Sequence, residues 1–220
     1  MSVKVGLKNI AIWNNESMED AVREYEKENV EKGQIVFYGP SNFTRWSKAY
    51  GMKPLRDSIF GASGAPCAIN RGFGSSCAEH QLYYYPRMVR PLAPKVLVYT
   101  FYGNGRAFGY SSEETWELAQ RVIAYTLTDF PDTHVYICGV HPLRDELDAC
   151  RLADKARFNS WLKRFAEETP NCFYIDLDKY DELMTRKDIF VEDGVHFNQT
   201  GYDMYAEIFK QELKDELARF

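Results

Sequence analysis

A serine, a histidine and an aspartate in this chain have the types and order that could supply a nucleophile, a base and an orienting acid. Asp193 and His196 lie three residues apart, in the segment Asp-Gly-Val-His before the last amphipathic run. Ser41 follows a short apolar run near the other end of the chain. A serine hydroxyl becomes nucleophilic when a histidine accepts its proton, and an acid fixes the tautomer of that histidine. The three residues therefore predict acyl-transfer chemistry.

Two further segments carry groups that could stabilise a developing negative charge. Gly74 and Ser75 belong to a stretch of small residues that follows the second apolar run and precedes a helical pattern. Backbone N–H groups at such a strand-to-helix turn can point at an oxyanion. Asn104 follows the third apolar run. Its side-chain amide could add a donor of a kind that contributes about 3 to 4 kcal/mol to transition-state stabilisation.

The elements that would position these residues are five short runs of apolar, β-branched or aromatic residues. Helical patterns separate most of them, which indicates a parallel sheet with helices on both faces and therefore an α/β fold. Ligands of such sheets bind beyond the carboxyl ends of the strands, where Ser41, Ser75 and Asn104 fall. The predicted strands are Gln34–Tyr38, Cys67–Asn70, Lys95–Phe101, Thr133–Gly139 and Cys172–Leu177.

Three of the helical patterns have recognisable boundaries. Ser111 or Ser112 is expected to cap a helix over residues 113–130, because glutamates follow at the spacing of a capping box. A second long helix is expected over residues 149–168, and Thr200 is expected to cap the last one.

The length of 220 residues suffices for one well-buried core, so we expect a single domain over residues 34–220. Residues 1–33 would form a lead-in with one charged helix that packs on the same domain. A net charge of −5 provides no electrostatic footprint for nucleic acid or anionic lipid. The N-terminus has no apolar stretch of signal-peptide length and no later run approaches a membrane span, which predicts a cytoplasmic protein. The five cysteines are widely spaced and have no histidine at ligand spacing, so no metal site is expected.

Four sequence blocks together resemble those of the SGNH hydrolases, also called the GDSL-like lipase and acylhydrolase family. The resemblance covers about residues 34–220 and implies a flavodoxin-like three-layer α/β/α sandwich with a five-stranded sheet of order 2-1-3-4-5. It also implies cleavage of acyl esters without a metal or cofactor. The blocks are Gly39-Pro40-Ser41 with Trp46, Asn70 to Ser75, Asn104, and Asp193-x-x-His196 followed by Gly201-Tyr202.

The same resemblance implies a role for each residue of the site. Ser41 would be the nucleophile, with His196 as its base and Asp193 as the partner of that base. The backbone N–H groups of Ser41 and Ser75 and the side-chain amide of Asn104 would form the oxyanion hole.

Three positions depart from the family pattern. Pro40 replaces the usual acidic or small residue before the nucleophile, but it leaves the N–H of Ser41 available. Ser75 stands where the family's oxyanion glycine is usual, and a serine is tolerated there if its backbone angles suit a residue with a Cβ. Gly105 follows Asn104 where the family usually has an aspartate.

Three further residues beside the predicted cleft, Gly74, Trp46 and His141, are interpreted as substrate contacts. Two of them, Trp46 and His141, have an alternative reading in which they serve the structure alone. Trp46 could pack in the core, and His141, which stands beside a proline, could be a solvated loop residue.

The predicted function is a serine esterase for short acyl groups, chiefly acetyl, with a small-molecule or carbohydrate ester as its partner. The alternative is a protein of the same fold that binds a sugar or an acylated ligand without turnover, as Pro40, Ser75 and Gly105 suggest. No Gly-x-Ser-x-Gly segment occurs, which argues against the other common serine hydrolase fold. The glycines between residues 72 and 74 lack the third member of a dinucleotide fingerprint.

Overall fold

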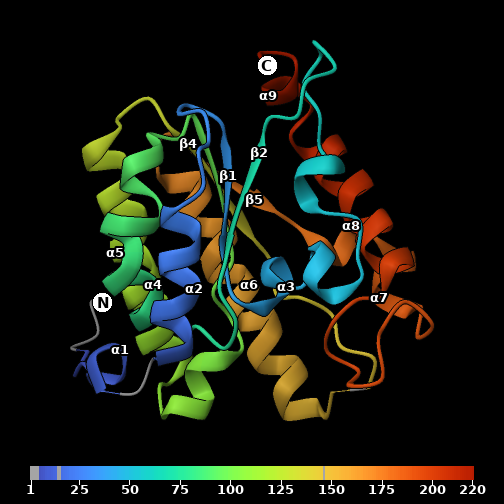
Figure 1. Cartoon of the computed structure of the whole chain (residues 1–220). Helices are drawn as coiled ribbons and strands as arrows, with labels where there is room; N and C mark the ends of the chain where they lie inside the picture. Colours follow the sequence, from blue (N-terminus) through green and yellow to red (C-terminus); the bar gives the residue numbers. More distant parts are fainter. Residues whose placement is uncertain (1–4, 14–15, 146) are drawn as a thin grey trace.

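The computed structural model describes residues 5–13, 16–145 and 147–220. Its centre is a parallel sheet of five strands in the order β2-β1-β3-β4-β5 (Figure 1). The predicted α/β class and strand order are therefore confirmed. The strands are β1 (Ile35–Gly39), β2 (Ala68–Gly72), β3 (Val96–Tyr99), β4 (His134–Cys138) and β5 (Cys172–Ile175).

Helices cover both faces of the sheet because successive strand residues point to opposite sides. In β1, Val36 and Tyr38 pack into one helix layer, whereas Ile35 and Phe37 pack into the other. The first layer contains α2 (Glu16–Glu26), α4 (Ala78–Met88), α5 (Ser112–Asp129) and α6 (Ala149–Glu168). The second contains α3 (Ser41–Thr44), α7 (Asp181–Thr185), α8 (Gln199–Glu212) and α9 (Lys214–Leu217). The inner strands β1 and β3 are buried on both faces, as their nearly continuous apolar sequences predict.

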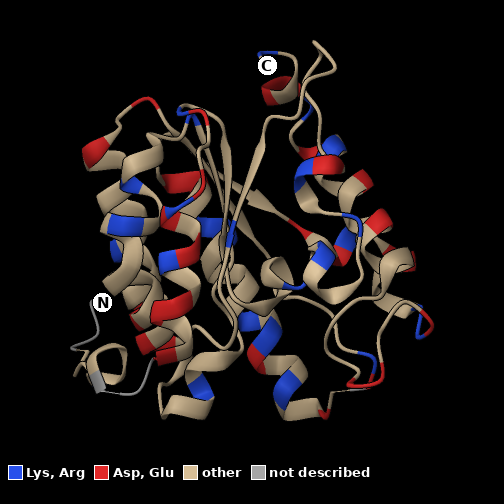
Figure 2. Cartoon of the chain, in the orientation of Figure 1, with Lys and Arg blue, Asp and Glu red and all other residues tan. Residues whose placement is uncertain are grey.

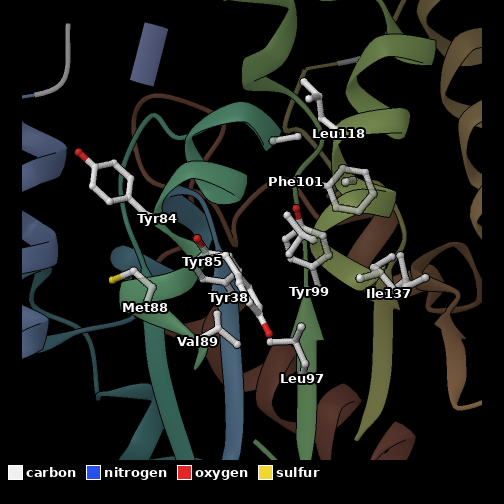
Figure 3. Close-up of a cluster of buried hydrophobic side chains, with 14 of the residues drawn as sticks. Tyr38, Tyr84, Tyr85, Met88, Val89, Leu97, Tyr99, Phe101, Leu118 and Ile137 are labelled. Carbon is white, nitrogen blue, oxygen red and sulfur yellow. The ribbon is translucent and has the colours of Figure 1, made fainter. Parts of the chain in front are cut away.

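The first layer contains buried tyrosines. Because water does not reach their hydroxyls, these groups need hydrogen-bond partners within the protein. Figure 3 shows Tyr38 and Tyr99 side by side on neighbouring strands. Their ring centroids are 5.9 Å apart. The Tyr38 hydroxyl donates to the backbone oxygen of Gln81 at 2.6 Å, and the Tyr99 hydroxyl donates to its side-chain oxygen at 2.9 Å. One glutamine of α4 therefore ties that helix to the two central strands.

The N-terminal cap of α5 matches the sequence prediction, whereas that of α8 differs from it. Ser111 caps α5 and forms a capping box with Glu114, as predicted. The predicted cap at Thr200 is wrong, because Thr200 lies within α8. Asn198 is the cap instead, and its side-chain oxygen accepts from the backbone N–H of Gly201 at 3.2 Å. Asparagine and threonine both favour this position, so the apolar pattern alone did not separate them.

The N-terminal segment packs on α4. The charged helix expected there is α2, which ends at Glu26, and the short α1 (Ile10–Trp13) precedes it. Val22 of α2 is completely buried, and Arg87 of α4 pairs with Glu19 and Glu26. These contacts cover the sheet face that carries α4.

No helix in the described part of the chain is both long and apolar enough to cross a membrane. All five cysteines are free, and Cys150, in the first turn of α6, is the one that is exposed.

Candidate active site

Ser41 lies directly beyond the carboxyl end of β1, as the first residue of α3. The Pro40 carbonyl accepts the backbone N–H of Phe43 at 3.1 Å, so the proline takes part in the turn without needing an N–H of its own. From the last helix, the Tyr202 hydroxyl donates to the Asn42 backbone oxygen at 2.9 Å. The nucleophile candidate is therefore fixed from both its strand and α8.

A chain of hydrogen bonds joins Ser41 to the loop before α8. The Asp193 Oδ2 lies 2.7 Å from the His196 Nδ1, and the His196 Nε2 lies 2.7 Å from the Ser41 Oγ. An ionised carboxylate only accepts, so Nδ1 carries the proton of the neutral ring and Nε2 is left to accept from the serine hydroxyl. The three side chains thus have the connectivity of a nucleophile, a base and an orienting acid.

The environment of Asp193 keeps its carboxyl ionised. Burial opposes ionisation, but the backbone N–H groups of His196 and Val195 and the His196 ring all donate to it, and together they hold the pKa of Asp193 well below its usual range. The carboxylate is therefore charged at neutral pH and in mild acid. Its charge would stabilise the imidazolium that forms when His196 takes a proton.

Two arginines that the sequence analysis did not single out also hold this loop. The Arg45 Nη1 donates to the Asp193 Oδ2 at 3.0 Å, the same oxygen that faces the histidine. Arg144 donates from its backbone N–H to the Gly194 carbonyl at 2.8 Å and from Nη1 to the Glu192 carbonyl at 3.0 Å. Arg45 lies inside the sequence block that contains Ser41. Its position there gave no sign that it would contact Asp193, which is far along the chain.

Two of the segments expected to form an oxyanion hole, those of Asn104 and Ser75, are in contact. The Asn104 Nδ2 donates to the Ser76 backbone oxygen at 2.9 Å, which joins the second and third sequence blocks. Ser75 has a φ of +59°, in the left-handed region that favours glycine. Within the described chain, the backbone N–H groups of Ser41 and Ser75 make no hydrogen bond. They remain available as donors.

A cavity of about 450 Å³ opens beside Ser41. Its walls come from the carboxyl end of β1, the short 3₁₀ helix η4 (Asn104–Phe108), the start of α5 and the first half of α6. Ser41, Asn104 and His141 line it, whereas Gly74 and Ser75 do not. The structure therefore brings the nucleophile candidate and one candidate oxyanion donor, Asn104, to the same cavity.

The sequence of this chain matches the model of the GDSL-like lipase/acylhydrolase family over residues 38–204. The chain belongs to this family. Its members are ester hydrolases, and the resemblance noted from the sequence blocks is confirmed. Among curated proteins, none matches the chain.

Solved structures of other acylhydrolases have a similar fold. A GDSL-like lipase from Bacteroides thetaiotaomicron is 17% identical, with a TM-score of 0.66 over 90% of this chain and 97% of that one. An acetyl xylan esterase is 17% identical, with a TM-score of 0.62 over 81% and 98% of the two chains. A catalytic mutant of an acetylxylan esterase from Geobacillus stearothermophilus is 12% identical, with a TM-score of 0.63 over 84% and 96%. At these identities the likeness establishes the fold alone.

The interpretation of Trp46 as a substrate contact of this acylhydrolase is wrong. Its side chain is completely buried and stacks on Tyr202 and Tyr205 of α8, with ring centroids 5.2 and 6.0 Å away. The indole therefore fixes α8 against the segment that follows α3, and it does not reach the cavity.

His141 does line the cavity of the acylhydrolase. Its Nε2 lies 3.2 Å from the Val195 carbonyl oxygen, in the loop that carries His196. Its ring packs on Phe197, with the two ring centroids 4.4 Å apart. Burial lowers the pKa of His141 to about 3, although its bond to Val195 acts in the opposite direction. The ring is therefore neutral near pH 7, and its contact with a substrate stays a prediction.

Proposed function

We propose that this acylhydrolase is a serine esterase that acts through an acyl-enzyme intermediate. The observation that carries the proposal is the unbroken chain of two 2.7 Å contacts from Asp193 through His196 to the Ser41 hydroxyl. The His196 Nε2 takes the proton of the Ser41 hydroxyl while the Ser41 Oγ forms a bond to the ester carbonyl carbon. Asp193 holds the ring in the required tautomer and balances its charge.

Two steps complete the reaction: loss of the alcohol, which forms the acyl-enzyme, and hydrolysis of that acyl-enzyme. The bond between the carbonyl carbon and the alcohol oxygen breaks, and His196 gives its proton to that oxygen, which leaves an acyl group on Ser41. Water, deprotonated by His196, attacks this acyl group and releases the acid, and the proton returns to the Ser41 Oγ. The Ser41 and Ser75 backbone N–H groups and the Asn104 amide are the proposed donors to the oxyanion in both steps.

The proposed acyl group is short, chiefly acetyl, and a carbohydrate is the proposed alcohol. The acetyl xylan esterases among the similar structures support this reading at the level of the fold. A series of 4-nitrophenyl esters from C2 to C12 tests the acyl part. The highest kcat/KM is expected at C2 to C4, and a maximum at C8 or longer would contradict it.

The nucleophile is tested with 4-nitrophenyl acetate and a serine-directed organophosphonate, on the wild type and on Ser41→Ala. We expect hydrolysis and a single covalent adduct in the wild type, and neither in the variant. Ser47→Ala is the matched control, because Ser47 lies just beyond the end of α3 and, among the described residues, its hydroxyl donates only to the Thr44 carbonyl. Its activity and adduct should persist.

The competing function is ligand binding without turnover on the same fold. The left-handed φ of Ser75 is the observation that favours it, because the family's glycine is missing where backbone freedom is needed. A wild type that forms no adduct and hydrolyses no ester, but binds an acetylated sugar, would establish this alternative.

A further inference from the structure

The walls of the cavity carry more positive than negative charge, although the whole chain has a net charge of −5. Among the described residues that line it, two are acidic, Glu113 and Asp154, and the basic ones are Arg106, Arg151, Lys155 and Arg157. Figure 2 shows basic residues on both η4 and the first turns of α6, at the carboxyl end of the sheet. This local excess opposes the charge of the molecule as a whole.

The two carboxylates are already occupied by neighbours. Asp154 accepts from the Tyr102 hydroxyl at 3.1 Å, from the Ser112 hydroxyl at 2.9 Å and from the Arg157 guanidinium at 2.6 Å. The Glu113 carboxylate lies 3.4 Å from the same guanidinium. Arg157 therefore contacts both carboxylates of the cavity wall and balances part of their charge.

Lys155 is also matched. Its ammonium lies 2.5 Å from the carboxylate of Asp178, which Asn159 holds from the other side at 2.9 Å. This ion pair is part of the contact between α6 and the segment after β5, so it builds the wall of the cavity.

Arg106 and Arg151 are the two cations that remain. Arg106 makes no ion pair with a carboxylate in the described part of the chain. Among the described residues, the Arg151 guanidinium has only the Asp148 Oδ2, at the long distance of 3.9 Å, while the other oxygen of that carboxylate caps α6 by accepting the Arg151 backbone N–H at 2.8 Å. Both residues line the cavity that Ser41 also lines. A guanidinium presents paired N–H donors that match a carboxylate, sulfate or phosphate.

We propose that the ester substrate carries an anionic group, a carboxylate, sulfate or phosphate, which binds Arg106 and Arg151 while its ester lies at Ser41. This inference rests on the proposed role of Ser41 and adds the substrate class. The rest of the substrate would lie against the apolar part of the wall, formed by Val140, Leu143, Leu147 and Val195. Neutral acetate esters would then be weak substrates.

The test compares 4-acetoxybenzoate with its neutral partner 4-acetoxybenzamide, and adds 4-acetoxyphenyl phosphate to separate a carboxylate from a phosphate site. The measurement is the ratio of kcat/KM for each anionic ester to that for the amide. The ratio should fall about three- to fivefold in Arg106→Gln and in Arg151→Gln, and about tenfold in the double variant, the size expected for solvent-exposed ion pairs. The wild-type ratio should also fall as salt rises from 0.05 to 0.5 M. Arg164→Gln, on the exposed far part of α6, is the matched control and should keep the wild-type ratio.

A second measurement separates this inference from the proposed function. Calorimetry with Ser41→Ala reports binding of uncleaved 4-acetoxybenzoate and 4-acetoxybenzamide without turnover. A binding preference for the benzoate that Arg106→Gln and Arg151→Gln remove supports the anionic site, even if the wild type hydrolyses neither ester. Hydrolysis that depends on Ser41, with equal ratios in the wild type and the arginine variants, would overturn the anionic site and leave the esterase intact. Equal binding of benzoate and benzamide would overturn it as well.

Discussion

Ser75 combines a backbone conformation that suits glycine with a side chain that has no visible role. Its φ of +59° costs a residue with a Cβ about 1 kcal/mol. Its hydroxyl makes no hydrogen bond within the described chain, and its proposed contribution is the backbone N–H. A glycine at this position would therefore relieve strain and retain the donor.

Ser75→Gly is accordingly expected to raise the free energy of unfolding by about 0.5 to 1 kcal/mol and to keep kcat at or above the wild-type value. Urea unfolding and 4-nitrophenyl acetate hydrolysis measure the two quantities. Ser160→Gly, at an exposed position inside α6, is the control of opposite sign and should lose about 0.5 kcal/mol. A loss of both stability and activity in Ser75→Gly would assign a function to the serine side chain.

At the scale of elements, the place of Ser41 depends on how closely β2 approaches α3. A Cβ at Gly72, the last residue of β2, would lie 2.4 Å from the Thr44 backbone nitrogen and 2.7 Å from the Phe43 carbonyl carbon. These are backbone atoms, so α3 would have to move as a unit and take Ser41 with it.

Gly72→Ala should therefore lower the free energy of unfolding by about 1 to 3 kcal/mol, as overpacking does. It should lower kcat by about a hundredfold, because a displacement near 1 Å misaligns the nucleophile. Kinetics at a temperature where the variant stays folded separate the two effects. Gly6→Ala, where a Cβ would meet no atom within 4 Å, serves as the control. Wild-type kcat in Gly72→Ala would mean that this contact does not position Ser41.

The sequence predicted the elements well where the signal was local. Every predicted strand end lies within two residues of the observed one, and α6 has the predicted bounds, because apolar runs and caps are properties of short segments. Trp46 was misread because its burial depends on Tyr202 and Tyr205, which lie far along the chain. Arg106 and Arg151 of the cavity belong to no sequence motif. They share a site only because η4 and α6 line the same cavity in the folded chain.

At the scale of the whole molecule, buried neutral histidines make stability depend on pH. His80 of α4 is completely buried, its Nδ1 accepts the Cys77 backbone N–H at 3.2 Å, and its Nε2 has no partner in the described chain. Burial lowers its pKa to about 4, against an opposing effect of Glu79. The unfolded chain therefore binds more protons than the folded one between about pH 6.5 and pH 4.

The stability that His80 contributes is thus present above pH 6.5 and is lost as the pH falls toward 4, by about 3 kcal/mol. In His80→Asn, whose side-chain oxygen can replace Nδ1 as the acceptor, this part of the acid destabilisation should disappear. Urea unfolding of both proteins from pH 4 to pH 8 measures the difference. The wild-type free energy of unfolding minus that of the variant should be constant above pH 7 and should fall as the pH drops below 6. Parallel curves across the whole range would contradict the assignment to His80.

The exposed thiol of Cys150 gives this protein a built-in attachment point. The other four thiols are buried, and burial raises the pKa of two of them, Cys67 and Cys172, to about 11, so they react slowly with maleimides. Cys150 lies in the first turn of α6 and directly precedes Arg151, which lines the cavity. An environment-sensitive dye can therefore be placed on the unaltered sequence at a single position, where its emission would follow each ligand that enters or leaves.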